Sequence, residues 1–287
     1  MMEVQVDGDI VAFRAGFGAE HMEYDVTYLD PTFGEEIVIT CRYKKEAVSM
    51  VNALKLRQIE AEIVPRRVLE PLAHALNNVN TILNRIMEDL NVQKPDLNVW
   101  LSGPSEENFR KKIGKILPYK GNRSDAWRPT YEQEIKQFMI KKWDAEVTFG
   151  QEADDAMGIA QMKCDFGTSC IASNDKDLDL IPGLHYNFVK GERYVVTNET
   201  ADWLFWQQML TGDKTDNILG IPGIGEKKAY AALEEIWDKP VEMEQQAWAL
   251  YVQTYGWAAW PAFLETGQLL WIRRKENELW TPPSAII

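Results

Sequence analysis

The spacing of apolar residues predicts the secondary structure of this chain. Within residues 68–90, apolar side chains recur at steps of three and four positions, which predicts one long amphipathic helix. Elsewhere, short apolar or β-branched runs predict strands, and longer mixed stretches predict helices. The predicted strands are residues 3–6, 37–40, 97–101, 146–149 and 169–173. The predicted helices are residues 131–143 and 153–163, whereas 10–17 fits either a helix or an extended segment.

The order of these elements indicates the fold class. Strands and helices alternate to about residue 185, which favours an α/β fold with a mainly parallel sheet covered by helices. From Trp203 onward the pattern is mostly helical, with a Gly-rich turn at residues 220–225. We therefore expect an α/β domain over residues 1–200 and a helical region over residues 201–287.

Acidic residues gather where the predicted strands end. Asp7 and Asp9 follow the first strand, residues 152–155 follow another, and Asp175 and Asp177 follow a third. Sites in parallel sheets lie at these strand ends, and hard oxygen ligands suit Mg²⁺ or Mn²⁺. Taken singly, each acidic pair also fits a helix cap or an ordinary loop.

A second acidic pair adjoins a Gly-rich hairpin. Asp213 and Asp216 lie three positions apart, and residues 218–229 follow with four glycines or prolines and a pair of lysines. Such a turn before a helix exposes backbone N–H groups that bind phosphate. The alternative is a helix connection that binds no ligand.

Composition limits the other possibilities. The 287 residues are 45% hydrophobic, enough for a core, and the net charge of -13 taken alone argues against a polyanion partner. Carboxylates that bind metal would contribute to that charge, and basic residues are clustered at 110–123 and 227–228. Three scattered cysteines and three histidines offer no zinc set, and neither a signal peptide nor a membrane span is recognisable. We expect a cytoplasmic protein.

Five blocks of this sequence resemble the flap endonuclease and 5′-to-3′ exonuclease family, which includes phage exonucleases and the 5′-nuclease domain of bacterial DNA polymerase I. The blocks occur in the family's order and span residues 4–229. They are Val6-Asp7-Gly8-Asp9, Phe109-Arg110 with Tyr119-Lys120-Gly121-Asn122-Arg123, Glu152-Ala153-Asp154-Asp155, Ser173-Asn174-Asp175-Lys176-Asp177, and Gly212-Asp213 to Asp216-Asn217 with the hairpin 220–228.

The resemblance implies a PIN-like 5′-nuclease domain followed by a helix–three-turn–helix module that grips duplex DNA. It implies a pair of Mg²⁺ or Mn²⁺ ions, with K⁺ as a further ion at the hairpin. The implied metal ligands are Asp7, Glu152, Asp154, Asp155, Asp175, Asp177, Asp213 and Asp216. Lys120 and Arg123 would contact the scissile phosphate, and Asp155 is also counted as catalytic. The implied DNA contacts are Arg110, Tyr119, Asn122, Gly220, Ile221, Gly223, Gly225, Lys227 and Lys228.

Two departures from the family pattern bear on activity. The family has an Asp at the end of the strand before Phe109, where this chain has Ser102-Gly103. Either Glu106 or Glu107 could substitute, or the ligand could be a group that reaches the metal through water, since Mg²⁺ keeps several waters. Only 28 residues separate Arg123 from Glu152, which argues against a long threading arch. The segment 124–143 would then either form one short helix with Lys141 and Lys142 near DNA or simply pack as an amphipathic helix.

The function implied is metal-dependent hydrolysis of DNA from the 5′ end or at 5′ flaps, in replication or degradation, by a phage-type protein expected to be a monomer. The missing Asp leaves open a catalytically impaired protein that binds DNA junctions or ends. A ribonuclease that acts on RNA–DNA hybrids is the third possibility.

Overall fold

The computed structural model describes residues 2–123 and 127–283, and these form two compact units. The first unit combines Met1–Val11, Ile82–Arg128 and Lys136–Ile287, and the second combines Ala12–Thr81 and Pro129–Ile135. The sequence predicted a different division, between residues 200 and 201. That boundary falls inside a helix, α7 (Asn198–Thr211), which packs on both the strand-end segment 176–180 and the C-terminal helices.

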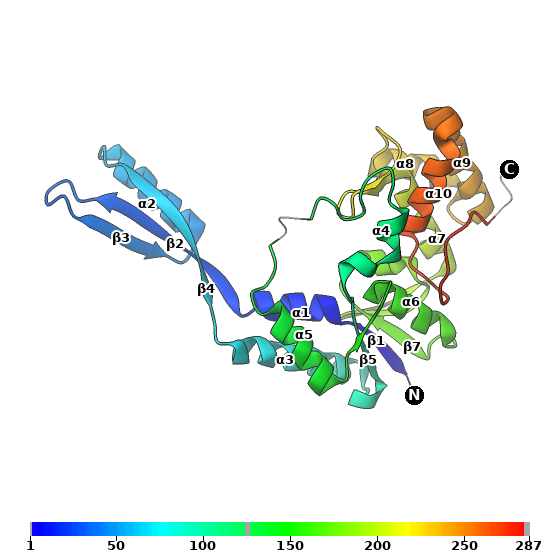
Figure 1. Ribbon diagram of the computed structural model, residues 1–287, viewed down its shortest axis with the longest axis horizontal. Helices are drawn as coiled ribbons and strands as arrows, with labels where there is room; N and C mark the ends of the chain where they lie inside the picture. The colour runs from blue at the N-terminus through cyan, green and yellow to red at the C-terminus, as the bar shows by residue number, and fades with distance from the viewer. Residues whose placement is uncertain (1, 124–126, 284–287) are drawn as a thin grey trace. The chain divides into compact units, whose positions relative to one another are not determined.

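A mainly parallel sheet of six strands organises the first unit (Figure 1). The strand order is β6-β5-β1-β7-β8-β9, and only the last pairing is antiparallel. The strands are β1 (Glu3–Asp7), β5 (Leu97–Leu101), β6 (Glu146–Val147), β7 (Ser169–Ala172), β8 (Gly183–Asn187) and β9 (Glu192–Val196). The α/β class predicted from the alternating pattern is confirmed.

The register of the central strands sets one edge of the sheet. Val6 of β1 pairs with Val99 of β5 on one side and with Ala172 of β7 on the other. Because these strands are parallel, the residues that follow each of them emerge at the same edge. Helix α6 (Ala153–Lys163) packs on β1, β5 and β7, so its first turn also lies near this edge.

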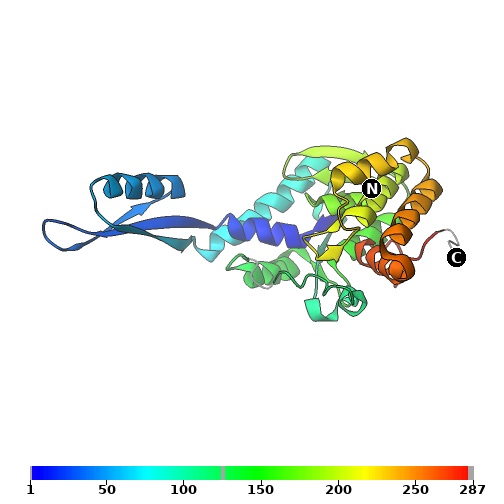
Figure 2. The same cartoon turned by 90° about the horizontal axis from the view of Figure 1, so that it is seen from above.

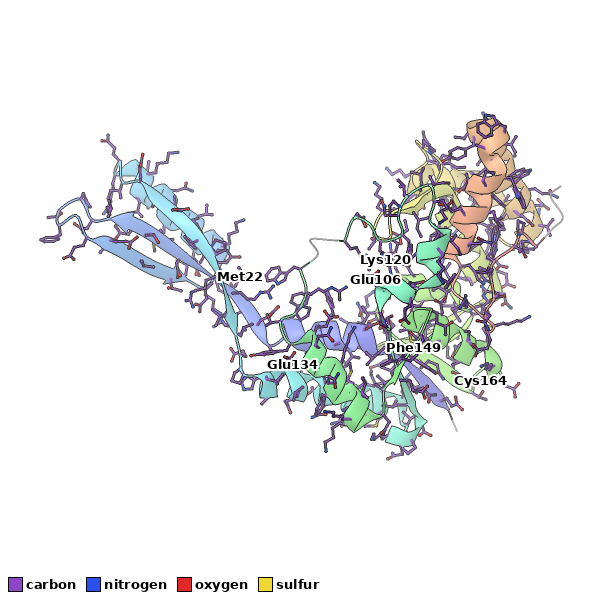
Figure 3. The ribbon with its side chains drawn as sticks, viewed as in Figure 1. Met22, Glu106, Lys120, Glu134, Phe149 and Cys164 are labelled. Carbon is purple, nitrogen blue, oxygen red and sulfur yellow. The ribbon has the colours of Figure 1, made fainter. Side chains whose placement is uncertain are left out.

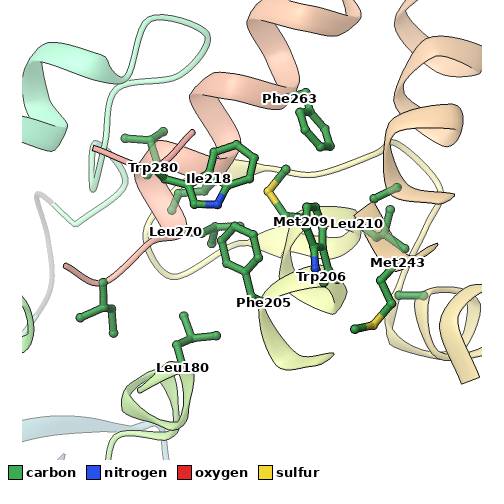
Figure 4. Packing of buried hydrophobic residues seen from close by; sticks show 14 of the residues in the cluster. Leu180, Phe205, Trp206, Met209, Leu210, Ile218, Met243, Phe263, Leu270 and Trp280 are labelled. Atoms are coloured by element: carbon green, nitrogen blue, oxygen red, sulfur yellow. The ribbon is translucent and has the colours of Figure 1, made fainter. Parts of the chain in front are cut away.

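The C-terminal helices share a core with the sheet. Helix α9 (Pro240–Tyr255) contacts both α8 (Glu226–Leu233) and α10 (Ala259–Leu270), and all three belong to the C-terminal part of the first unit (Figures 1 and 2). Phe205, Trp206 and Phe263 are buried there with Trp280, and the same cluster reaches Leu180 beside the sheet (Figure 4). The other elements of this unit are α4 (Phe109–Ile113), β10 (Gly212–Asp213) and β11 (Ile218–Leu219).

The second unit is a three-stranded antiparallel sheet with one covering helix. Its elements are β2 (Glu20–Leu29), β3 (Glu36–Cys41), α2 (Lys44–Leu56) and β4 (Ala61–Leu69), and the strand order is β3-β2-β4. Val26, Cys41 and Ala47 form its small core. Three further helices have residues in both units: α1 (Gly8–Phe17), α3 (Leu72–Leu90) and α5 (Glu132–Trp143).

Several predicted bounds change. The helix expected from residue 68 begins at Leu72, because Val68 and Leu69 belong to β4 and Pro71 follows. The strand expected over 146–149 is only Glu146–Val147, and residues 10–17 are helical. Of the expected segment 124–143, residues 124–126 lie outside those described, and α5 exposes Lys141 and Lys142.

Candidate active site

Four segments of the first unit bring carboxylates together at the edge where β1, β5 and β7 end. Asp7 closes β1, Asp175 and Asp177 follow β7, and α6 opens with Glu152 and Asp154. Asp213 and Asp216 come from the segment between α7 and β11. Glu152, Asp154, Asp177, Asp213 and Asp216 line one cavity of about 40 Å³. The sequence-predicted carboxylates therefore meet in space, except Asp155.

Burial and mutual repulsion raise the pKa of several of these carboxyls. Burial, with the charges of Asp9 and Asp175, raises the pKa of Asp7 from 3.8 to about 7. Burial, with the charges of Asp175 and Asp213, raises the pKa of Asp177 to about 6. The pKa of Asp154 is also well above its usual range, through burial and the charges of Asp7 and Asp175. Ionising the whole group requires a compensating positive charge.

Lys120 and Arg123 supply part of that charge. The Lys120 ammonium contacts the carboxylate of Glu152 and lies 3.5 Å from Oδ2 of Asp216, and Arg123 pairs with Oδ1 of Asp216. Burial alone would raise the pKa of Glu152, but the charges of Lys120 and Arg110 outweigh it and lower the pKa to about 2. Lys120 (Figure 3) adopts a φ of +55°, and its N–H donates to the Asp216 carbonyl at 2.8 Å. The backbone thus fixes this lysine against the acidic segment.

Tyr119 and Asn122 connect the loop that carries Lys120 to the acidic segments. The buried Tyr119 hydroxyl lies 2.7 Å from both Oε2 of Glu152 and Oδ2 of Asp216. Asn122 donates to the Lys214 carbonyl at 2.7 Å. The sequence predicted that Tyr119 contacts DNA, but its side chain is only 2% exposed, so it positions carboxylates and has no surface for a base.

Asp155 and Arg110 form a buried ion pair. Arg110 donates from Nη1 and Nη2 to Oδ2 and Oδ1 of Asp155 at 2.6 and 2.8 Å, and the two residues are 2% and 0% exposed. The backbone N–H groups of Arg273 and Glu152 also donate to Asp155. With both carboxylate oxygens occupied, Asp155 does not fit its predicted metal and catalytic roles. Arg110 likewise has no surface for its predicted contact with DNA.

Ser102 occupies the strand end where the family has an acid. Its Oγ accepts the Ala153 N–H at 3.0 Å, and its own N–H donates to Oδ2 of Asp9 at 2.9 Å. Asp9 in turn pairs with Lys136 at 2.7 Å. The two proposed substitutes, Glu106 (Figure 3) and Glu107, lie on an exposed 3₁₀ turn. Asp9 therefore places a carboxylate in hydrogen-bond contact with the residue that follows β5.

The hairpin divides into a packed half and an exposed half. A Cβ on Gly220 would lie 2.2 Å from the Gly212 nitrogen, and Ile221 is only 4% exposed. Their side-chain positions face the core, so the predicted DNA contacts at Gly220 and Ile221 do not fit the structure. Gly223, with φ of +80°, Gly225, Lys227 and Lys228 are exposed. Contacts with DNA at these four residues stay a prediction.

The donor set fits a divalent cation. All the clustered groups are oxygen donors, which Mg²⁺ and Mn²⁺ prefer. Among the described residues, no three such groups converge closely enough to enclose an ion as they stand. Gln208 of α7, which we did not identify from the sequence, lines the same cavity, and its buried Oε1 has no hydrogen-bond partner within the described part of the chain. The metal roles of the carboxylates stay predictions.

The raised pKa values predict how stability changes with pH. In the folded, metal-free protein Asp7 and Asp177 hold protons up to about pH 7 and 6, whereas unfolded carboxyls release them near 3.8. The folded state therefore binds more protons between these limits, and stability falls as pH rises through this window. For Asp7 alone the loss is on the order of 4 kcal/mol.

The measurement is thermal unfolding in chelator from pH 5 to 8. We expect the melting temperature to fall over this range, and excess Mg²⁺ to restore it more at pH 8 than at pH 5. A melting temperature that rises toward pH 8 in chelator would contradict the crowding of these carboxylates.

Comparisons with known proteins relate this site to nucleases. The chain is 32% identical over 140 residues to an exodeoxyribonuclease of Enterobacteria phage T3, covering 44% of this chain and 46% of that protein. It is 31% identical over 159 residues to DNA polymerase I of Rhizobium leguminosarum, covering 49% of this chain and 15% of the polymerase. An exonuclease of Escherichia phage T7 is 32% identical over 126 residues, covering 42% of this chain and 41% of that exonuclease. The chain thus spans less than half the length of each of these relatives. No family model matches.

Solved structures share the fold. The T5 D15 protein co-crystallised with metal ions matches with a TM-score of 0.54 at 15% identity, over 94% of this chain and 89% of that one. T5 5′-exonuclease with bound divalent zinc matches with the same TM-score and coverage at 17% identity. At this identity the likeness concerns the fold alone. Together with the curated relatives, it confirms the predicted resemblance to the 5′-nuclease family.

No helix in the described ranges combines the length and apolarity needed to cross a bilayer.

Proposed function

We propose that this protein is a divalent-metal-dependent 5′-to-3′ exonuclease or flap endonuclease that hydrolyses DNA. The observation that carries the proposal is the meeting of seven carboxylates from four segments beside Lys120 and Arg123. These carboxylates are Asp7, Glu152, Asp154, Asp175, Asp177, Asp213 and Asp216. Structural roles alone do not account for seven carboxyl groups gathered so closely, one of them buried and six partly buried.

The chain's own residues supply the rest of the chemistry. Ions held by the carboxylates would activate water and stabilise the leaving oxygen. Lys120 and Arg123 contact Glu152 and Asp216. With those carboxylates neutralised by bound ions, the side chains of Lys120 and Arg123 would be available to bind the scissile phosphate, where negative charge grows in the transition state. Tyr119 keeps Glu152 and Asp216 oriented.

The exposed half of the hairpin is the proposed duplex contact, in a helix–three-turn–helix role. Gly225 precedes α8 and leaves open space around its Cα, so a phosphate can approach the first N–H groups of the helix. Lys227 and Lys228 add charge on the same turn, and Lys228 also donates to the Gly223 carbonyl at 2.9 Å. These contacts do not depend on base sequence.

Neutralising both lysines tests this contact. We expect the variant Lys227→Ala with Lys228→Ala to bind duplex DNA more weakly at every sequence, with the log–log salt slope flattened by roughly one to two units. The measurement is a fluorescence titration against salt with Ca²⁺ in place of Mg²⁺. Lys239→Ala is the control, because Lys239 is exposed but pairs with Glu242 beyond α8. Equal slopes for the double variant and the control would remove the hairpin from the DNA interface.

The substrate class is tested by digesting three labelled substrates in parallel: blunt DNA duplex, 5′-flap DNA and RNA–DNA hybrid. We expect Mg²⁺-dependent cutting of the two DNA substrates that excess chelator stops. Cutting of the hybrid alone would replace the proposal with a ribonuclease.

A second candidate, a catalytically impaired protein that binds DNA ends, is favoured by Ser102 at the end of β5. Its distinguishing result would be tight binding of flap DNA with no cleavage in Mg²⁺ or Mn²⁺.

A further inference from the structure

Gln208 lies among the carboxylates without being one. It sits on α7, five residues before Asp213, within a stretch where Phe205, Trp206 and Met209 are buried in the core. Its side chain lines the cavity shared by Asp177, Asp213 and Asp216. Core residues, among them Leu180 and Leu270, line the same cavity.

The orientation of the amide follows from its neighbour. Nε2 of Gln208 donates to Oδ1 of Asp177 at 2.8 Å. Because the NH₂ group of the amide is engaged by Asp177, the carbonyl oxygen faces away from that carboxyl group. This contact also holds the Asp177 carboxylate in place.

No described residue donates a hydrogen bond to the Gln208 carbonyl oxygen. Oε1 of Gln208 is buried and makes no hydrogen bond to any residue in the described ranges. Buried acceptors normally have a partner, and one left without it costs free energy. The cavity beside it, about 40 Å³, has room for water. The missing partner is therefore a donor or a cation that enters the cavity.

We propose that Gln208 is a positioning residue for the metal site formed with Asp177 and Asp213. Nε2 holds Asp177, and Oε1 accepts a hydrogen bond from water carried by the bound divalent ion. Mg²⁺ and Mn²⁺ keep several waters when carboxylates bind them, and groups that orient such waters and ligands tune affinity. This role rests on the proposed function, because it requires that the carboxylates bind metal.

Two variants distinguish the role of the Gln208 carbonyl oxygen from the role of its NH₂ group, and a third variant serves as the control. Gln208→Met removes both at similar volume, whereas Gln208→Glu keeps an oxygen acceptor and removes the donor. Gln207→Met is the matched control, since Gln207 is a half-buried glutamine on the same helix. The readout is Mn²⁺ binding to the full-length, metal-free protein by electron paramagnetic resonance, with the melting temperature in chelator as a check of folding.

We expect Gln208→Met to weaken Mn²⁺ binding at one site by about tenfold or more. Gln208→Glu should bind Mn²⁺ at least as tightly as wild type, and Gln207→Met should be unchanged. Wild-type affinity in Gln208→Met would overturn the role of Gln208, as would equal weakening in Gln208→Met and Gln208→Glu. If Gln208→Met does not fold, Gln208→Glu alone decides: weaker Mn²⁺ binding than wild type would overturn the role of Gln208. Failure of the wild-type protein to bind Mn²⁺ would instead overturn the proposed function, and this inference with it.

Discussion

Replacing Asp155 with alanine is expected to destabilise the protein by about 3–5 kcal/mol. The variant leaves the buried Arg110 guanidinium without its closest counter-charge. Arg110 would keep the carbonyls of Leu269 and Trp271, to which it donates at 2.9 and 2.7 Å, and the more distant Glu152 carboxylate at 3.5 Å, which Lys120 already contacts. Since the pair joins α4, α6 and the C-terminal segment, its loss weakens three parts of the first unit together.

Asp154→Ala is the matched control, one residue away on the same helix. The Asp154 carboxylate makes no such pair and is repelled by Asp7 and Asp175. In chelator we therefore expect Asp154→Ala to leave stability unchanged or increase it. Urea unfolding in chelator measures both variants. Equal urea unfolding midpoints for Asp154→Ala and Asp155→Ala would contradict the assignment of Asp155 as a structural residue and of Asp154 as a proposed metal ligand.

Asp177→Ala is expected to reduce Mg²⁺-dependent cleavage on the order of a thousandfold or more, while the protein stays folded. The variant removes one proposed ligand and relieves repulsion with Asp175 and Asp213, so the metal-free protein should not lose stability. Binding of DNA in Ca²⁺ should persist, because a negative charge near phosphate has been removed.

Asp179→Ala provides the comparison for cleavage. Asp179 lies two residues further on, but its carboxylate accepts from the Tyr194 hydroxyl at 2.8 Å and is not one of the clustered groups. Its removal should leave the cleavage rate close to wild type. If Asp177→Ala cleaves as fast as Asp179→Ala, Asp177 is not a metal ligand in the reaction.

The alternation of strands and helices could be predicted because each strand and helix of the α/β fold has its own periodic pattern of apolar residues. Ala153–Lys163 was predicted to the residue, and β1, β5 and β7 to within one residue. The second unit was largely missed. In β2, residues 22–28 do alternate apolar and polar side chains, a strand pattern that was overlooked; Glu23 and Asp25 on its polar face pair with Arg66 of β4. Pro65 within β4 argues against a strand, because proline cannot donate a hydrogen bond to the sheet.

The candidate site was also only partly predictable from the sequence. Carboxylates at strand ends were predictable, because parallel strands deliver their ends to one edge. The roles within the acidic pair 154–155 were not, because they depend on Arg110, a residue 45 positions away that becomes a partner only in the folded chain. Gln208 carried no signal at all in the sequence. Its importance lies in one buried oxygen, unpartnered within the described residues, on a side chain that lines the acidic cavity, and only the tertiary structure reveals this.

Cleavage of a 5′-flap DNA whose flap strand is labelled at its 3′ end tests the central claim most directly. The wild-type protein is incubated with this substrate in Mg²⁺ and, in parallel, in excess chelator. We predict that the labelled strand shortens from its 5′ end in Mg²⁺ and remains intact in chelator. Cleavage that persists in chelator, or an intact strand in both Mg²⁺ and Mn²⁺, would contradict a metal-dependent 5′-nuclease.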